Sequence, residues 1–131
     1  MPKKVIVIIP NWNGAPDLPA SIDSVLTQSF KDFDLVVVDN GSSDRSKEVI
    51  ESYVAKDGRV RGIYRDKNYG YTGGVNPGIE VAAQEGAIYA APFNNDAYAD
   101  KDWLKHLVHF LDEHPTHGIA ACTILHADGK T

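Results

Sequence analysis

Three consecutive polar side chains, Asn94, Asn95 and Asp96, follow an apolar run that extends over residues 87–93. If that run is a buried strand, its carboxyl end presents two amides and a carboxylate at an edge of the sheet, where open α/β sheets bind ligands. Such oxygens suit a hard cation, because Mg²⁺ usually takes one or two protein carboxylates together with substrate phosphates. Asn and Asp are also common in ordinary turns. The segment alone therefore leaves a cation site and a plain turn open.

Similar polar turns follow three other apolar runs of the chain. With the turn at 94–96, the polar residues that end expected strands are Asn11 and Asn13, Asp39 and Asn40, Arg65 and Asn68. In a parallel sheet all strand carboxyl ends share one edge, and ligands bind in the crevice outside that edge. The convergence of four polar turns favours a ligand site of unspecified kind over a plain turn.

The apolar pattern predicts strands that alternate with helices along the chain. Continuous β-branched runs are typical of strands buried on both faces, whereas apolar residues recurring at helical spacing indicate amphipathic helices. We expect strands at 5–9, 35–38, 60–64, 87–93 and 119–125, and helices that include 18–26, 49–54, 77–83 and 103–111. Strict alternation predicts an α/β fold with a parallel, Rossmann-like sheet, right-handed crossovers and helices on both faces.

Local signals set the expected helix starts. Asn76 before Pro77 is typical of an N-cap followed by proline at the first helical position, so we interpret the Gly- and Tyr-rich segment 65–75 as a loop. Ser42 or Ser43 is expected to cap the helix that follows the second strand. For Trp12, in the turn after the first strand, we expect a packing role.

The composition bounds the class of protein. With 131 residues, 43% hydrophobic and 24% charged, the chain is expected to form one soluble domain, 1–131. Its net charge of −5 disfavours a nucleic-acid partner. Cys122, the single cysteine, excludes an internal disulfide and is expected to be a small buried hydrophobe. The apolar runs are too short for a signal peptide or a membrane span. We therefore expect a cytoplasmic protein, or one peripheral to the inner face of the membrane.

Three blocks of sequence resemble the family 2 glycosyltransferases, which have the GT-A nucleotide-sugar-binding fold. The first is VIVIIPNWNGAPDLPASIDSVLTQSFKDFDLVVVDNGSSDRS, the second is NYGYTGGVNPGIEVA, and the third is PFNNDA. They occur in the family's order and spacing, and the resemblance extends from residue 5 to about residue 129. It implies a protein of polysaccharide biosynthesis that takes a nucleoside-diphosphate sugar of the UDP or dTDP type. With Mg²⁺ or Mn²⁺, such a protein transfers the sugar to an acceptor hydroxyl with inversion.

The resemblance also implies which residues form the site. The nucleotide-binding positions would be Pro10, Asn13, Asp39, Asn68, Gly74, Asn76, Asn94 and Asn95. Asp39 matches the family's aspartate that accepts a hydrogen bond from the imide N–H of the base, a role that an ionised carboxylate suits. The turn at 94–96 falls at the family's D-x-D motif, with Asp96 as the metal ligand and Asn94 in place of the first aspartate. Without that carboxylate, we expect weak metal affinity in the absence of nucleotide.

The family's general base lies in the later half of the domain, beyond Thr131, so no catalytic residue is assigned. We therefore interpret 1–131 as the donor-binding part of a GT-A domain that stops after its fifth strand, and a cut sheet edge favours a homo-oligomer. Two functions stay open. One is a glycosyltransferase that acts on a sugar or a lipid-linked acceptor, and the other is a nucleotide-sugar-binding module without turnover. A receiver-like regulatory domain would need acidic residues after the first strand, where Asn11, Trp12 and Asn13 stand.

Overall fold

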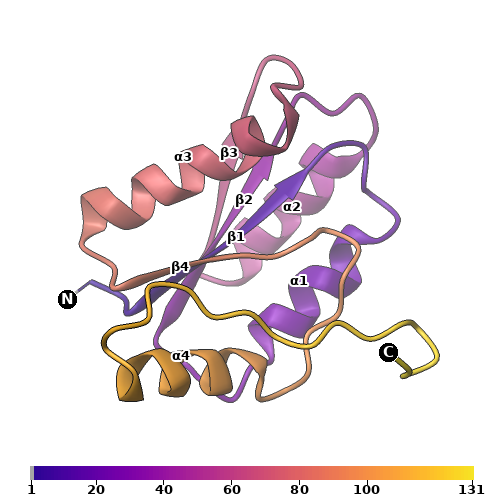
Figure 1. Ribbon diagram of the computed structural model, residues 1–131. Coiled ribbons are helices and arrows are strands. Elements are labelled where there is room, and N and C mark those ends of the chain that lie inside the picture. Colours follow the sequence, from indigo (N-terminus) through magenta and orange to yellow (C-terminus); the bar gives the residue numbers. More distant parts are fainter. Residues whose placement is uncertain (1) are drawn as a thin grey trace.

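The computed structural model describes residues 2–131 and has a sheet of four parallel strands at its centre (Figure 1). The strands are β1 (Val5–Asn11), β2 (Phe33–Asp39), β3 (Val60–Tyr64) and β4 (Tyr89–Pro92). They lie in the order β3-β2-β1-β4, and every pair of neighbours is parallel. The α/β fold with a parallel sheet, expected from the sequence, is confirmed.

Four helices cover the two faces of this sheet. They are α1 (Leu18–Leu26), α2 (Ser46–Lys56), α3 (Gly70–Glu85) and α4 (Trp103–Glu113). Val5, Val7 and Ile9 of β1 join one apolar cluster with α1, α2 and α4. Ile6 and Ile8 join a second cluster with α3. Figure 1 shows α3 above the sheet and α1 and α4 below it. Because β1 is buried on both faces, its sequence is a continuous apolar run.

The register of the strands brings their polar ends together. Asn11 pairs with Asp39, and Asp39 pairs with Tyr64, at the carboxyl ends of β1, β2 and β3. On the other side of β1, Phe93 follows β4 and its N–H donates to the carbonyl oxygen of Ile8 over 2.8 Å. The polar turns that follow these strands therefore leave the sheet at one edge, as the sequence predicts.

The start of α3 differs from the expected one. The helix begins at Gly70, so Asn76 is not its N-cap and Pro77 lies inside it. Proline has no N–H, so the carbonyl oxygen of Gly73, one helical turn earlier, receives no hydrogen bond from Pro77. Nη1 of Arg65 donates to that oxygen over 3.2 Å instead. The expected N-cap and proline signal was wrong because a side chain replaces the missing backbone donor.

Two glycines let α3 lie close to β1. A Cβ atom at Gly74 would lie 2.8 Å from Cβ of Pro10, and one at Gly78 would lie 2.6 Å from Cγ2 of Ile8. Residues four apart share one face of a helix. Gly74 and Gly78 thus form a side-chain-free face against β1, which is the close backbone approach that glycine permits.

The segment 119–125 forms no strand, so the expected fifth strand is wrong. The side chains of Ile119 and Ile124 are 87% and 86% exposed, and Cys122 is exposed rather than buried as expected. A strand needs a neighbour for its backbone hydrogen bonds, and this segment pairs with none of the four strands that residues 2–131 form. Within residues 2–131, no helix combines the length and the apolar character needed to cross a membrane.

Candidate functional site

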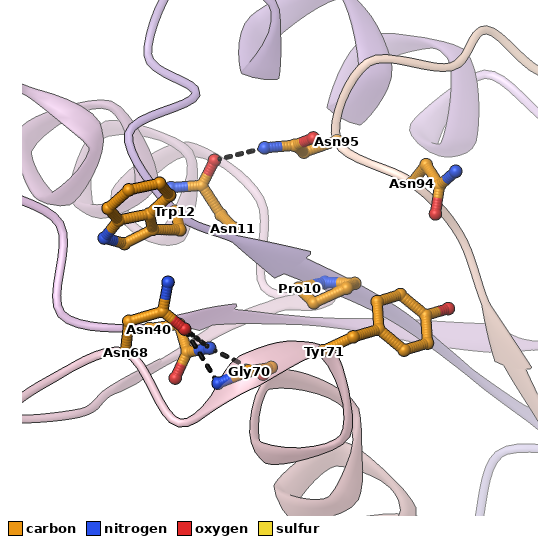
Figure 2. Close-up of a pocket in the computed structure, with 9 residues that line it drawn as sticks. All are labelled: Pro10, Asn11, Trp12, Asn40, Asn68, Gly70, Tyr71, Asn94 and Asn95. Atoms are coloured by element: carbon orange, nitrogen blue, oxygen red, sulfur yellow. Dashed lines mark hydrogen bonds between the residues drawn. The ribbon is translucent and has the colours of Figure 1, made fainter.

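A pocket of about 260 Å³ lies at the carboxyl edge of the sheet (Figure 2). Its lining comes from the ends of β1 and β2, the start of α3 and the turn after β4. The lining residues are Pro10, Asn11, Trp12, Asn40, Asn68, Gly70, Tyr71, Asn94 and Asn95. The structure therefore brings the polar strand ends together around one cavity whose polar side chains are all amides apart from the Tyr71 hydroxyl and the Trp12 indole.

Asn11 connects three of these elements. It is the last residue of β1 and only 2% exposed. Its Nδ2 donates to Oδ1 of Asp39 over 3.0 Å, and its Oδ1 accepts from Nδ2 of Asn95 over 2.9 Å. Gly14 leaves the space for this second contact, because a Cβ there would lie 2.3 Å from Nδ2 of Asn95. The ends of β1 and β2 and the turn after β4 are thus joined through one buried amide.

Asn40, which follows β2, connects the end of that strand to the start of α3. Its Nδ2 donates to Oδ1 of Asn68 over 3.0 Å and to the carbonyl oxygen of Gly70 over 2.8 Å. Its Oδ1 accepts from the backbone N–H of Tyr69 over 3.1 Å. Gly70 has a φ of 76°, a left-handed conformation that favours glycine. One side chain at the end of β2 therefore fixes the turn that leads into α3.

Two exposed aromatic side chains border the pocket. Trp12 is 55% exposed and Tyr71 is 60% exposed, and Figure 2 shows them on either side of Pro10. The packing role expected for Trp12 was wrong, because its ring lies at the mouth of a pocket rather than in a core. An exposed aromatic ring offers a face on which a planar group can stack. The sequence signal for both residues is their position directly beside a predicted polar turn.

The structure distributes six of the eight predicted nucleotide-binding residues over three places. Pro10, Asn68, Asn94 and Asn95 line the pocket, Gly74 packs beneath Pro10, and Asn76 is exposed on α3. Tyr71 also lines the pocket and was not predicted to do so, and Asn11 and Asn40 were predicted only as residues of polar turns.

Asp39 lies behind the pocket and is 4% exposed. Its Oδ1 accepts from Asn11 and from the hydroxyl of Ser42, and its Oδ2 accepts from the backbone N–H of Ser42 over 3.1 Å. A carboxylate has about four acceptor positions. These three hydrogen bonds therefore leave Oδ2 able to accept one more donor.

Asn13 joins the turn after β1 to the turn after β2. It has a φ of 49°, and its Oδ1 accepts from the backbone N–H of Ser43 over 2.8 Å. Its own N–H donates to the hydroxyl of Ser42 over 2.8 Å. Neither serine caps α2 as expected, because α2 begins at Ser46, whose N–H donates to Oδ1 of Asp44 over 2.9 Å. The two serines instead form hydrogen bonds with Asn13, which join the turn after β1 to the turn after β2.

Asp96 is exposed and follows the two asparagines that line the pocket. No group of three or more His, Cys, Asp or Glu side chains that could hold a metal occurs within residues 2–131. A single carboxylate next to a pocket fits a cation whose remaining ligands are phosphate oxygens and water, which is the usual arrangement for Mg²⁺. The donor set thus fits a shared cation and not a metal site built from protein alone.

Positive charge lies on the other side of the pocket, at the turn before α3. The guanidinium of Arg65 lies 4.2 Å from the ring centre of Tyr69, and Nζ of Lys67 lies 5.1 Å from it. Such cation–π contacts hold flexible cationic side chains near one position. The N–H of Gly70 donates to Oδ1 of Asn68 over 2.8 Å. The start of α3 therefore combines two cations with the N–H groups that follow Gly70 in its first turn, and N–H groups at a helix N-terminus attract anions.

Comparisons with known sequences show the family of the chain. Residues 6–131 match the family model described as Glycosyl transferase family 2. A PGL/p-HBAD biosynthesis glycosyltransferase of Mycobacterium tuberculosis is 32% identical over 108 residues, which cover 82% of this chain and 41% of that protein. Glycosyltransferase GlyG of Streptococcus pneumoniae is 29% identical over 85 residues, which cover 65% and 28%. The chain thus spans about two fifths of the mycobacterial relative.

Solved structures have the same fold. TarS 1–349 of S. aureus, in complex with UDP-GlcNAc, matches with a TM-score of 0.71 and 28% identity, over 86% of this chain and 32% of that one. The mannosyltransferase PcManGT from Pyrobaculum calidifontis, in complex with GDP-Man and Mn²⁺, matches with a TM-score of 0.73 over 85% and 33%. At 20% identity, this second match concerns the fold alone. The GT-A fold expected from the sequence is confirmed, and the chain belongs to the family 2 glycosyltransferases.

Proposed function

We propose that this chain is the donor-binding part of a glycosyltransferase and binds a nucleoside-diphosphate sugar of the UDP or dTDP type. The observation that carries the proposal is the pocket at the carboxyl edge of the sheet, where amide side chains from three strand ends meet an exposed indole. TarS, which is 28% identical, has been solved with UDP-GlcNAc, and this supports a uridine nucleotide.

The base of the nucleotide stacks on Trp12 and donates its imide N–H to Oδ2 of Asp39. Asn94 and Asn95 bind the ribose hydroxyls or the water around a cation, for which uncharged amides offer both donors and acceptors. The diphosphate lies toward the start of α3, because a helix N-terminus attracts anions and Arg65 and Lys67 lie beside it. This places the anion nearer to Gly70 than to Asn76.

Asp96 holds Mg²⁺ or Mn²⁺ together with the diphosphate. When bound, the cation neutralises negative charge that develops on the diphosphate as the leaving group departs. Asp96 supplies the only charged protein oxygen in the turn 94–96, so the affinity for the cation depends on the nucleotide. The whole enzyme transfers the sugar with inversion to a hydroxyl of a sugar or a lipid-linked acceptor.

The second candidate function is nucleotide-sugar binding without turnover. It is favoured by the lining of the pocket, because none of the nine lining residues is a carboxylate or a histidine. Inverting transfer needs a general base within hydrogen-bond reach of the acceptor hydroxyl. The two functions share the donor site and differ only in whether sugar transfer follows binding.

Calorimetry with UDP, dTDP and GDP, each with and without Mn²⁺, tests the donor site. We expect UDP or dTDP to bind, with higher affinity when Mn²⁺ is present, and an absence of binding by both would overturn the proposal, whether or not GDP binds. Trp12→Ala should weaken binding about tenfold, because stacking of one base contributes ~1–3 kcal/mol. Trp12→Phe, which keeps an aromatic face, serves as the matched control. Release of sugar from a panel of nucleotide sugars then separates transfer from binding alone.

A further inference from the structure

A row of polar side chains from α1 and the residues after it contacts the segment that carries Asp96. Ser21 and Ser24 lie on α1, and Gln28 follows just after its end. Residues three or four apart share one side of a helix. The side chains of Ser21 and Gln28 are fully buried. Buried polar groups cost free energy unless they are hydrogen-bonded, so the partners of this row indicate its role.

Ser21 contacts the backbone on both sides of Asp96. Its Oγ lies 2.7 Å from the carbonyl oxygen of Asn95 and 2.6 Å from that of Ala97, and its single proton is shared between them. Ser24 continues the contact, because its Oγ accepts the N–H of Ala99 over 3.0 Å. The carbonyl groups of the residues on either side of Asp96 are thus hydrogen-bonded to α1.

Gln28 holds the far end of the same segment. Its Nε2 donates to the carbonyl oxygen of Asp100 over 2.6 Å, and its Oε1 accepts the N–H of Leu104 over 3.0 Å. Leu104 belongs to the first turn of α4, where the N-cap residue Asp102 makes no side-chain cap hydrogen bond. The segment 95–104 is therefore attached to α1 from one end to the other.

We propose that Ser21 is a positioning residue for the cation-binding carboxylate of Asp96. This inference rests on the proposed function, in which Asp96 holds a divalent cation shared with the diphosphate. A cation bound by one protein carboxylate has no second protein ligand to hold it if that carboxylate moves. The backbone at 95–97 therefore sets the position of the Asp96 carboxylate, and with it that of the cation, relative to the pocket. The side chain of Asn95 is held independently by its hydrogen bond to Asn11 over 2.9 Å, so loss of the Ser21 contacts acts on Asp96 more than on the pocket lining.

The experiment compares the affinity for UDP with and without Mn²⁺ in the wild type and in Ser21→Ala. We expect the enhancement by Mn²⁺ to fall about tenfold or more, since loss of a group that orients a metal ligand typically costs 10–100-fold in metal affinity. The affinity for UDP without metal should change by less than about twofold, because Ser21 contacts no lining side chain but only backbone oxygens. Full enhancement by Mn²⁺ in Ser21→Ala would overturn the proposal.

Two further variants separate positioning from a general loss of stability. Ser21→Thr keeps the hydroxyl and should retain most of the Mn²⁺ enhancement. Ser46→Ala removes an equally buried hydroxyl from α2, and we expect it to leave the enhancement unchanged. If Ser21→Ala does not fold, Ser24→Ala takes its place. It removes the acceptor of the Ala99 N–H and should also lower the Mn²⁺ enhancement, by a smaller factor. An unchanged enhancement in Ser24→Ala would then overturn the proposal.

Hydrogen exchange in the free protein distinguishes failure of this inference from failure of the proposed function. In Ser21→Ala, the backbone N–H groups of Ala99 and Leu104 should exchange faster, while those of α2 keep their rates. If the wild type binds no nucleotide, the proposed function fails, and unchanged exchange at Ala99 overturns the positioning role as well. Faster exchange at Ala99 in that case retains the role of Ser21 in holding the segment, independently of any nucleotide.

Discussion

Two segments border the pocket, and they differ in how many side chains hold them in place. Among the described residues, Asn40 makes all the hydrogen bonds that join the turn 68–70 to residues distant in sequence, and there are three of them. The segment 95–104 is held by a row of side chains from α1 and by Ser29, whose N–H donates to the carbonyl oxygen of Lys101 over 3.0 Å. Loss of one group therefore releases the first segment and only loosens the second. A single anchor makes the start of α3 the more vulnerable side of the pocket.

The largest effect is expected for Asn40→Ala. It removes a 4% exposed amide and leaves the N–H of Tyr69 and the carbonyl oxygen of Gly70 without their partner. At about 1 kcal/mol per lost hydrogen bond, we expect the free energy of unfolding to fall by about 2–3 kcal/mol. Urea unfolding measures this change. As a control, Asn76→Ala changes an exposed position of α3, and its free energy of unfolding should stay within about 0.5 kcal/mol of the wild type.

A smaller loss is expected for Gln28→Met, which keeps the length of the side chain and removes its polar atoms. The N–H of Leu104 and the carbonyl oxygen of Asp100 lose a partner, but Ser21 and Ser24 still hold the segment. We expect the free energy of unfolding to fall by about 1–2 kcal/mol, measured by the same urea titration. Gln84→Met, exposed on α3, is the matched control. A loss as large as that of Asn40→Ala would contradict the contrast between one anchor and several.

The smallest effect concerns a single titration at the start of α4. A hydrogen bond from the hydroxyl of Ser29, over 2.5 Å, lowers the pKa of Asp102 below its usual value, with nearby lysines adding to the effect. Ser29→Ala should raise that pKa toward the usual value, which an NMR titration of the Asp102 carboxyl measures. A lowered folded pKa stabilises the protein above the unfolded pKa, and this contribution is lost as the pH falls through the folded one. An unchanged Asp102 pKa in Ser29→Ala would show that the lysines alone cause the shift.

The sequence predicted the sheet better than it predicted the details of the pocket. Apolar runs with a partner strand became strands, whereas 119–125 has the same apolar character and pairs with nothing. Composition does not record which strand will lie beside a segment. The turn 94–96 was placed correctly at the sheet edge because a buried strand precedes it. Its further role is a prediction that rests on the proposed function.

The positions that were misjudged depend on contacts between distant residues. Trp12 could equally have packed or lined a pocket, because exposure depends on what surrounds the turn. The early start of α3 relies on Asn40 and Arg65, neither of which lies next to Gly70 in sequence. Gln28, for which the sequence predicted no role, accepts from the N–H of Leu104 because α4 begins beside the end of α1. Each of these outcomes is set by tertiary structure that local propensity does not contain.

Pro77 has a consequence for the electrostatics of the pocket. An amide at that position would compete with the guanidinium of Arg65 for the carbonyl oxygen of Gly73. Because proline has no N–H, the guanidinium of Arg65 keeps this hydrogen bond to Gly73, which a backbone N–H would otherwise make. An imino acid within a helix thus determines where a permanent positive charge stands, about one helical turn away from it.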